Sequence, residues 1–322
     1  MPEMDVLYLP LNNARKKSIL LMLICATLWS IAGIFIKLIP WNPLIIAGFR
    51  SLIASGVIAI YMRSKGMRFT LNRTSVLCGI MLMLTCVGFV SATKLTTAAN
   101  AIVLQYTSPI YIMLISAVLY RQRFRLADIL TVGFTLFGIS LFFFDQFSIG
   151  HPLGNIIGLL SGVTMAGMFV TTCKADGDAR MSGILLGHIF TTLINAPMVF
   201  FIPTPFTGPA VLSILILGVV QLGIPYVLFG IAAQNCPPLA CSLISTVEPL
   251  LNPVWVFLFA GEAPGPFALT GGAVVLGTIT LWFVKQSRLQ AGAGGQTEAA
   301  GSENGEVKGN ESPDRDKTES SV

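Results

Sequence analysis

Residues 98–120 read AANAIVLQYTSPIYIMLISAVLY, a run of 23 residues that contains no Asp, Glu, Lys or Arg. A helix needs about 20 apolar residues to cross the hydrocarbon layer of a membrane. Pro109 stands near the middle of the run, where its missing N–H removes one hydrogen bond from a helix. The run therefore predicts a membrane-spanning helix whose backbone is disturbed at Pro109.

Similar runs recur along the whole chain. Only 11% of the 322 residues are charged and 54% are hydrophobic, whereas a soluble domain carries about 25% charged residues. Most of the outer surface must therefore face lipid, and we predict an all-α integral membrane protein with ten transmembrane helices. The predicted spans are 18–39, 43–62, 75–94, 98–120, 126–144, 155–174, 183–202, 211–233, 238–260 and 266–284.

The lysines and arginines predict the orientation of these spans. If the N-terminal segment, 1–17, is cytoplasmic, fourteen Lys and Arg residues lie at cytoplasmic ends, and only Lys37 and Lys94 lie at the opposite ends. This positive-inside bias is typical of multi-pass proteins of the cell membrane, and the even helix count puts both termini in the cytoplasm. Residues 291–322 are rich in Gly, Ser and Glu, so we expect a disordered cytoplasmic tail.

The fourth and ninth predicted spans resemble each other. Pro109 and Pro249 both lie near the middle of their spans, and with these prolines in register residues 97–101 align with residues 237–241. Further on, Thr131-Val132-Gly133 aligns with Thr270-Gly271-Gly272 after a one-residue gap. We therefore predict an internal repeat of five helices, with one copy at 18–144 and the other at 155–284.

An odd number of helices in each copy requires the second copy to insert upside down. The loop after the fourth span contains Arg121, Arg123 and Arg125, whereas the corresponding loop at 261–264 contains no Lys or Arg. This difference in charge is what inversion requires. Inverted repeats are typical of secondary transporters, whose substrate site lies near the midplane between the halves.

Several short motifs resemble those of a known family. Trp29 and Lys37, followed by Pro43 and Arg50, resemble the start of EamA-type members of the drug/metabolite transporter superfamily. A second set of residues resembles the end of the second repeat in that family, namely Glu248-Pro249, Gly261-Glu262, Gly272 and Gly277. Arg121-Gln122 departs from the pattern, since the first repeat often has a Gly-Glu-like pair there. The resemblance covers residues 18–285 and implies a ten-helix carrier, and many members export metabolites such as amino acids.

Arg50 and Glu248 place formal charges well inside predicted spans. An ionisable group at such depth is costly and is by default a candidate functional residue. Arg50 either extends to the headgroups, or pairs with backbone carbonyls or with Glu248, or binds a substrate carboxylate. Glu248 is the strongest candidate of all, for exchange of a proton or a substrate ammonium, and its alternative role is to bridge helices.

Other polar and aromatic side chains at depth complete the set of substrate-binding or coupling candidates. Gln105 and Tyr106 precede Pro109, and Gln221 and Tyr226 flank Pro225, where freed backbone carbonyls can line a cavity. Each candidate has a structural alternative, which is interhelical hydrogen bonding or simple packing. The remaining candidates are His188, Trp29 and Asn252.

Signatures of catalysis are missing from the sequence. It contains no phosphate-binding loop, no H-E-x-x-H and no G-x-S-x-G, so we expect no catalytic residue, no cofactor and no metal site. The six cysteines form no CxxC pair, and we interpret them as reduced packing residues. Without a phosphate loop, direct coupling to ATP is disfavoured, which leaves a proton or an exchanged solute.

The sequence therefore predicts a secondary-active transporter that exports a small metabolite by alternating access. An amino-acid-like solute is one candidate substrate. A membrane enzyme that acts on lipid-linked substrates, and a channel or scaffold subunit, are the alternatives. The expected partners are a small-molecule substrate and the lipid bilayer, with no nucleic acid, and a homodimer is left open.

Overall fold

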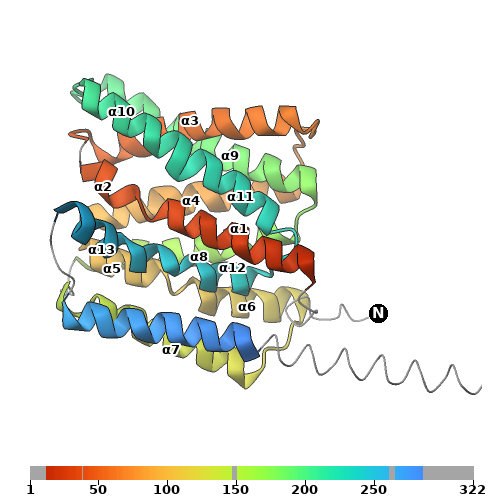
Figure 1. Ribbon diagram of the computed structural model, residues 1–322. Helices are drawn as coiled ribbons and strands as arrows, with labels where there is room; N and C mark the ends of the chain where they lie inside the picture. Colours follow the sequence, from red (N-terminus) through yellow and green to blue (C-terminus); the bar gives the residue numbers. More distant parts are fainter. Residues whose placement is uncertain (1–11, 38, 147–150, 261–264, 286–322) are drawn as a thin grey trace, which may run out of the picture.

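The computed structural model describes residues 12–37, 39–146, 151–260 and 265–285. Within these ranges the chain is all-helical, and the helices run side by side along one common direction (Figure 1). Seven helices in the described part are long and apolar enough to cross a membrane. The prediction of an all-α membrane fold is confirmed at this level, and the segments 291–322 and 1–11 lie outside the described residues.

In the described ranges the helices form ten rods, several of which are interrupted. The uninterrupted ones are α3 (Pro43–Ser64), α4 (Arg73–Leu95), α7 (Leu126–Phe142), α8 (Pro152–Lys174), α9 (Gly177–Asn195) and a last helix, Pro266–Lys285. The interrupted ones are α1 and α2 (Asn13–Trp29, Ala32–Lys37), α5 and α6 (Ala98–Gln105, Ser108–Tyr120), α10 and α11 (Gly208–Ile216, Ile224–Ala232), and α12 and α13 (Pro238–Ser245, Val247–Ala260). Short 3₁₀ segments, η2 (Phe144–Gln146) and η3 (Ala196–Phe200), follow α7 and α9.

The spans predicted at 98–120 and 238–260 each contain a break, and the disturbance predicted at Pro109 is present. A proline lacks the N–H that would bond to the carbonyl four residues earlier, so the helix is interrupted between that residue and the proline. α5 ends at Gln105, four residues before Pro109, and α12 ends at Ser245, four residues before Pro249. Both half-helices have eight residues. The predicted span 18–39 is also interrupted, at Ser30 and Ile31.

The rod at α10–α11 contains a different irregularity. The seven residues Leu217–Gly223 (η4) form a π-helix directly before Pro225. A π-helix inserts one extra residue into the turn, and such segments are often found at functional sites. The Ile224 N–H bonds to the Val219 carbonyl five residues back, which accommodates the proline without ending the rod. Gln221 lies within this irregular turn.

One predicted boundary is corrected by a buried arginine. α9 begins at Gly177 and not at 183, because the Asp176 carboxylate caps the helix by accepting from the Ala179 N–H at 2.8 Å. This start brings Arg180 into the helix, where it is buried. Its guanidinium donates to the carbonyls of Thr172, Ala175 and Gly230, at 2.9, 2.6 and 3.4 Å. These three bonds offset the cost of burying the charge.

The rods pack in a layered arrangement (Figure 1). α3, α9 and α10 lie on one side, and α7 lies with the last helix on the opposite side. Between them α4 packs against α8 and α9, and α1 packs against α11. Small residues of α8 allow close approach: a Cβ at Gly162 would lie 2.8 Å from the Leu104 carbonyl oxygen and 3.0 Å from that of Gln105. α8 thus presses against the break between α5 and α6.

Candidate functional site

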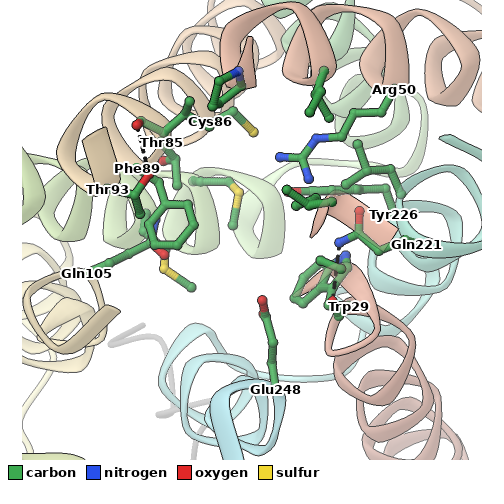
Figure 2. Close-up of a pocket in the computed structure, with 18 residues that line it drawn as sticks. Trp29, Arg50, Thr85, Cys86, Phe89, Thr93, Gln105, Gln221, Tyr226 and Glu248 are labelled. Carbon is green, nitrogen blue, oxygen red and sulfur yellow. Dashed lines mark hydrogen bonds between the residues drawn. The ribbon is translucent and has the colours of Figure 1, made fainter. Parts of the chain in front are cut away.

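A cavity of about 350 Å³ lies in the middle of the bundle, where the irregular helices meet (Figure 2). Side chains of α1, α3, α4, α8, α11 and α13 contribute to its wall. Six of the nine candidates predicted from sequence line it, namely Trp29, Arg50, Gln105, Gln221, Tyr226 and Glu248. Much of the remaining wall is apolar, with Ile46, Phe89, Met165, Met168 and Leu222 among its residues.

Two opposite charges face this cavity. Arg50 projects its guanidinium into the cavity from α3, and Glu248 points its carboxylate into it from α13 on another side (Figure 2). The Arg50 Nε is buried without a hydrogen-bond partner, so the side chain is not held by backbone carbonyls at that atom. Glu248 accepts from Tyr106 and from no cation in the described part of the chain. The space between the two charges is therefore open to a ligand.

Glu248 is positioned by the break in its own helix. Pro249 cannot donate to the Ser245 carbonyl, which is left without its helical partner. The Tyr106 hydroxyl approaches that carbonyl at 3.2 Å and the Glu248 Oε2 atom at 2.9 Å, so one donor serves both acceptors. Tyr106 does not line the cavity, and instead joins the break of one helix to the break of the other.

The break after α1 brings a second set of polar atoms to the cavity. The Gln221 side-chain amide donates to the Trp29 carbonyl at 3.3 Å, at the point where α1 ends. The Gln221 Oε1 and Trp29 Nε1 atoms are buried without partners. With the Arg50 Nε, the cavity residues thus carry two unpaired donors and one unpaired acceptor. Because buried polar groups normally have partners, these atoms indicate a site for a polar ligand.

An aromatic cluster supports this side of the cavity. The Trp29 and Tyr226 ring centroids are 5.2 Å apart, and the His188 and Tyr226 centroids are 4.5 Å apart with the rings nearly perpendicular. His188 is fully buried behind Tyr226 and is not part of the wall. Both of its ring nitrogens lack partners. Asn252 lies within α13, and its side chain is outside the described residues.

Sequence reasoning missed the contribution of α4. Thr85, Phe89 and Thr93 line the cavity, four residues apart, so they share one face of the helix. Ser161 of α8 connects this face to the candidate Gln105: the Gln105 Nε2 donates to the Ser161 Oγ at 2.9 Å, and that hydroxyl donates to the Thr85 carbonyl at 3.2 Å. The regular spacing of the two threonines was the available signal, although threonine is common on any membrane helix.

Comparison with known families relates part of the chain to membrane transporters. Residues 16–144 match the EamA-like transporter family. This match lies within the first half of the chain. The predicted resemblance to EamA-type transporters of the drug/metabolite superfamily is confirmed, and so is the prediction of a multi-pass membrane transporter and not an enzyme.

The similarity to curated transporters extends over most of the chain. The uncharacterised transporter YdfC of Bacillus subtilis is 25% identical over 295 residues, which cover 85% of this chain and 94% of YdfC. The pseudopaline exporter CntI of Pseudomonas aeruginosa is 24% identical over 273 residues, 81% of this chain and 94% of CntI. An uncharacterised transporter of Archaeoglobus fulgidus is 26% identical over 215 residues, 66% of this chain and 77% of that protein.

A protein of known crystal structure has the same fold. It superposes with a TM-score of 0.73 over 85% of this chain and 99% of its own, at 19% sequence identity. At this identity the likeness concerns the fold alone.

Proposed function

We propose that this protein is a secondary-active exporter of a small, amino-acid-like metabolite that works by alternating access. The observation that carries the proposal is the central cavity with Arg50 and Glu248 on different sides and no ion pair between them. A zwitterion satisfies both groups at once, with its carboxylate on the Arg50 guanidinium and its ammonium on the Glu248 carboxylate. Arginine is suited to the first role because its planar fork matches a carboxylate.

Glu248 is also the coupling residue in this proposal. A carboxylate in a largely apolar cavity is costly when charged, so it must bind a cation or a proton. Substrate ammonium and proton then compete for the same oxygens, and one leaves as the other arrives. The exchange requires no cofactor and no phosphate-binding loop.

Two inverted five-helix units, at 18–144 and 155–284, form the framework of the proposal. The family match at 16–144 has nearly the bounds of the first unit. The eight-residue half-helices α5 and α12, each ending four residues before a proline, support the pairing of the two units. Broken helices in corresponding positions of two repeats are a feature of transporters with a midplane site.

The direction of access follows from the predicted topology. The cavity wall extends to Ile36, Pro43 and Thr93, near the ends of α2 and α4 and the start of α3. The charge distribution assigns these helix ends to the outside of the membrane. The cavity therefore corresponds to an outward-facing conformation. Export is supported by the similarity to the exporter CntI.

Counterflow in proteoliposomes tests the transport function. Vesicles that contain the purified protein are loaded with one unlabelled amino-acid-like solute at a time, and uptake of the same labelled solute is followed. We expect accumulation that saturates with external concentration for zwitterions, and none for the matching esters or N-acyl derivatives, which lack one charge. Flux that does not saturate would favour a channel, and equal flux of zwitterions and esters would contradict the roles of Arg50 and Glu248.

A further inference from the structure

Two neighbouring cysteines at the start of α12 and one at the end of α8 meet at one end of the bundle, away from the cavity. Cys173 is the penultimate residue of α8, Cys241 lies in α12, and Cys236 lies in the connection before α12. The Cys173 and Cys241 sulfur atoms are 4.0 Å apart. The Cys241 thiol also approaches the Cys236 carbonyl at 3.7 Å. All three thiols are free.

The two closest thiols differ in access and share a charged neighbour. Cys173 is half-buried at the end of its helix, whereas Cys241 is fully buried. The Arg180 guanidinium is held by the carbonyls of Thr172 and Ala175, which bracket Cys173 in sequence. The thiolate form of a cysteine is the nucleophile in reactions with peroxides. An accessible thiol next to a second thiol is the arrangement of redox-sensitive cysteine pairs.

We infer that Cys173 and Cys241 form a redox-modifiable pair whose disulfide pins α12 to α8 and slows transport. The oxidant is a hydroperoxide. The Cys173 thiolate attacks one peroxide oxygen, the O–O bond breaks, and the released hydroxide takes a proton to leave as water while Cys173 becomes a sulfenic acid. The Cys241 thiol then attacks that sulfur and displaces a second water. Two thiols and one hydrogen peroxide thus give one disulfide and two waters.

The position of Cys241 explains the expected effect on transport, and this step rests on the proposed function. α12 is the half-helix that ends at Ser245, immediately before the break and Glu248. In the proposed alternating-access cycle, this break is the point at which α12 would move relative to α8. A disulfide needs the sulfur atoms about 2.05 Å apart. It therefore draws α12 and α8 together and holds α12 in place on one side of the break.

The chemical part is tested on the purified full-length protein in lipid nanodiscs. The protein is treated with hydrogen peroxide, the remaining thiols are blocked, and the disulfide is mapped by peptide mass spectrometry before and after dithiothreitol. We expect a reducible Cys173–Cys241 cross-link, absent from Cys173→Ser and from Cys241→Ser. Cys236→Ser is the matched control, since it removes a neighbouring buried thiol and keeps the pair. No cross-link, or one that joins Cys236 to Cys241, would overturn the inference, and the wild-type map decides this even if a variant fails to fold.

Transport is then measured on the same variants after reconstitution into proteoliposomes and the same peroxide treatment. We expect the rate to fall in proportion to the oxidised fraction in wild type and in Cys236→Ser, to recover with dithiothreitol, and to be insensitive to peroxide in Cys173→Ser. A cross-link that leaves the rate unchanged would refute its regulatory role. If the protein transports none of the solutes tested, the proposed function fails while the mapped disulfide still stands.

Discussion

The interrupted helices α5–α6 and α12–α13 share a backbone design and differ in the residue that precedes the proline. In both, an eight-residue half-helix ends four residues before the proline. The position directly before it is Ser108 in the first and Glu248 in the second. The Ser108 hydroxyl lies 3.0 Å from that of Ser242 in the buried contact between the two helices, whereas Glu248 faces the cavity. The same kind of break thus places a packing residue before the proline in one helix and a cavity-lining carboxylate in the other.

Under the proposed function, this difference gives the two predicted repeats a single coupling site. A second carboxylate beside Glu248 would have to be desolvated against a like charge, which is unfavourable. The first break instead supplies neutral groups: the Tyr106 hydroxyl donates to Glu248 at 2.9 Å, and Gln105 lines the cavity. The break at α12–α13 therefore carries the charge, and the break at α5–α6 provides its hydrogen-bond donor.

The largest expected effect comes from Glu248→Gln. The amide keeps the shape of the side chain but cannot exchange a proton, so we expect normal insertion with transport driven by a pH gradient abolished. Initial rates in proteoliposomes with and without the gradient provide the measurement. Ser108→Ala is the matched control at the corresponding position of the other break. It loses one hydrogen bond, at a cost of about 1 kcal/mol in stability, and retains the dependence on the gradient. Wild-type rates and pH dependence in Glu248→Gln would show that the carboxylate has no coupling role.

Gly162→Ala should have the next largest effect, through the first break. The added Cβ would lie 2.8 Å from the Leu104 carbonyl oxygen, so α8 must move away from α5. We expect a loss of about 2–3 kcal/mol in stability, in the range for overpacked cores, seen as a lower midpoint of thermal aggregation in detergent. Gly133→Ala in α7 is the control, because no atom lies within 4 Å of its added Cβ. Equal midpoints for the two variants would mean that the close approach of α8 is not needed.

Tyr106→Phe removes the hydrogen bonds that join the two breaks, and its effect on stability and transport should be smaller. Removing the hydroxyl leaves the Ser245 carbonyl without its donor and Glu248 without the partner at 2.9 Å. We expect a loss of about 1–2 kcal/mol, the typical cost of an unsatisfied buried group, together with slower transport at an unchanged substrate preference. Thermal aggregation and counterflow on one preparation measure both. A variant as stable and as fast as wild type would indicate that the two breaks act independently.

The membrane fold and part of the candidate site were predictable from sequence because each depends on local chemistry. Twenty apolar residues have few alternatives to a membrane span, and a proline inside such a run must disturb the helix. Charge is so costly in lipid that Arg50 and Glu248 stand out without any coordinates, and both line the cavity. The same reasoning placed Gln105, Gln221 and Tyr226 near prolines, and these residues line it as well.

The remaining features depend on which helix faces touch, and a single sequence does not contain that information. The cavity face of α4, with Thr85, Phe89 and Thr93, is set by how α4 packs against α8 and α9. His188 carries the same chemical signal as Arg50, yet the fold places it behind Tyr226 and outside the cavity wall. Composition and the prolines therefore determined that the chain spans a membrane and that helices break near Pro109 and Pro249, whereas the interruption at Ser30 and Ile31 was not predicted. Only the packing of distant helices decided which of the polar side chains share one cavity, because contacts between residues far apart in sequence are fixed by shape complementarity and not by local propensity.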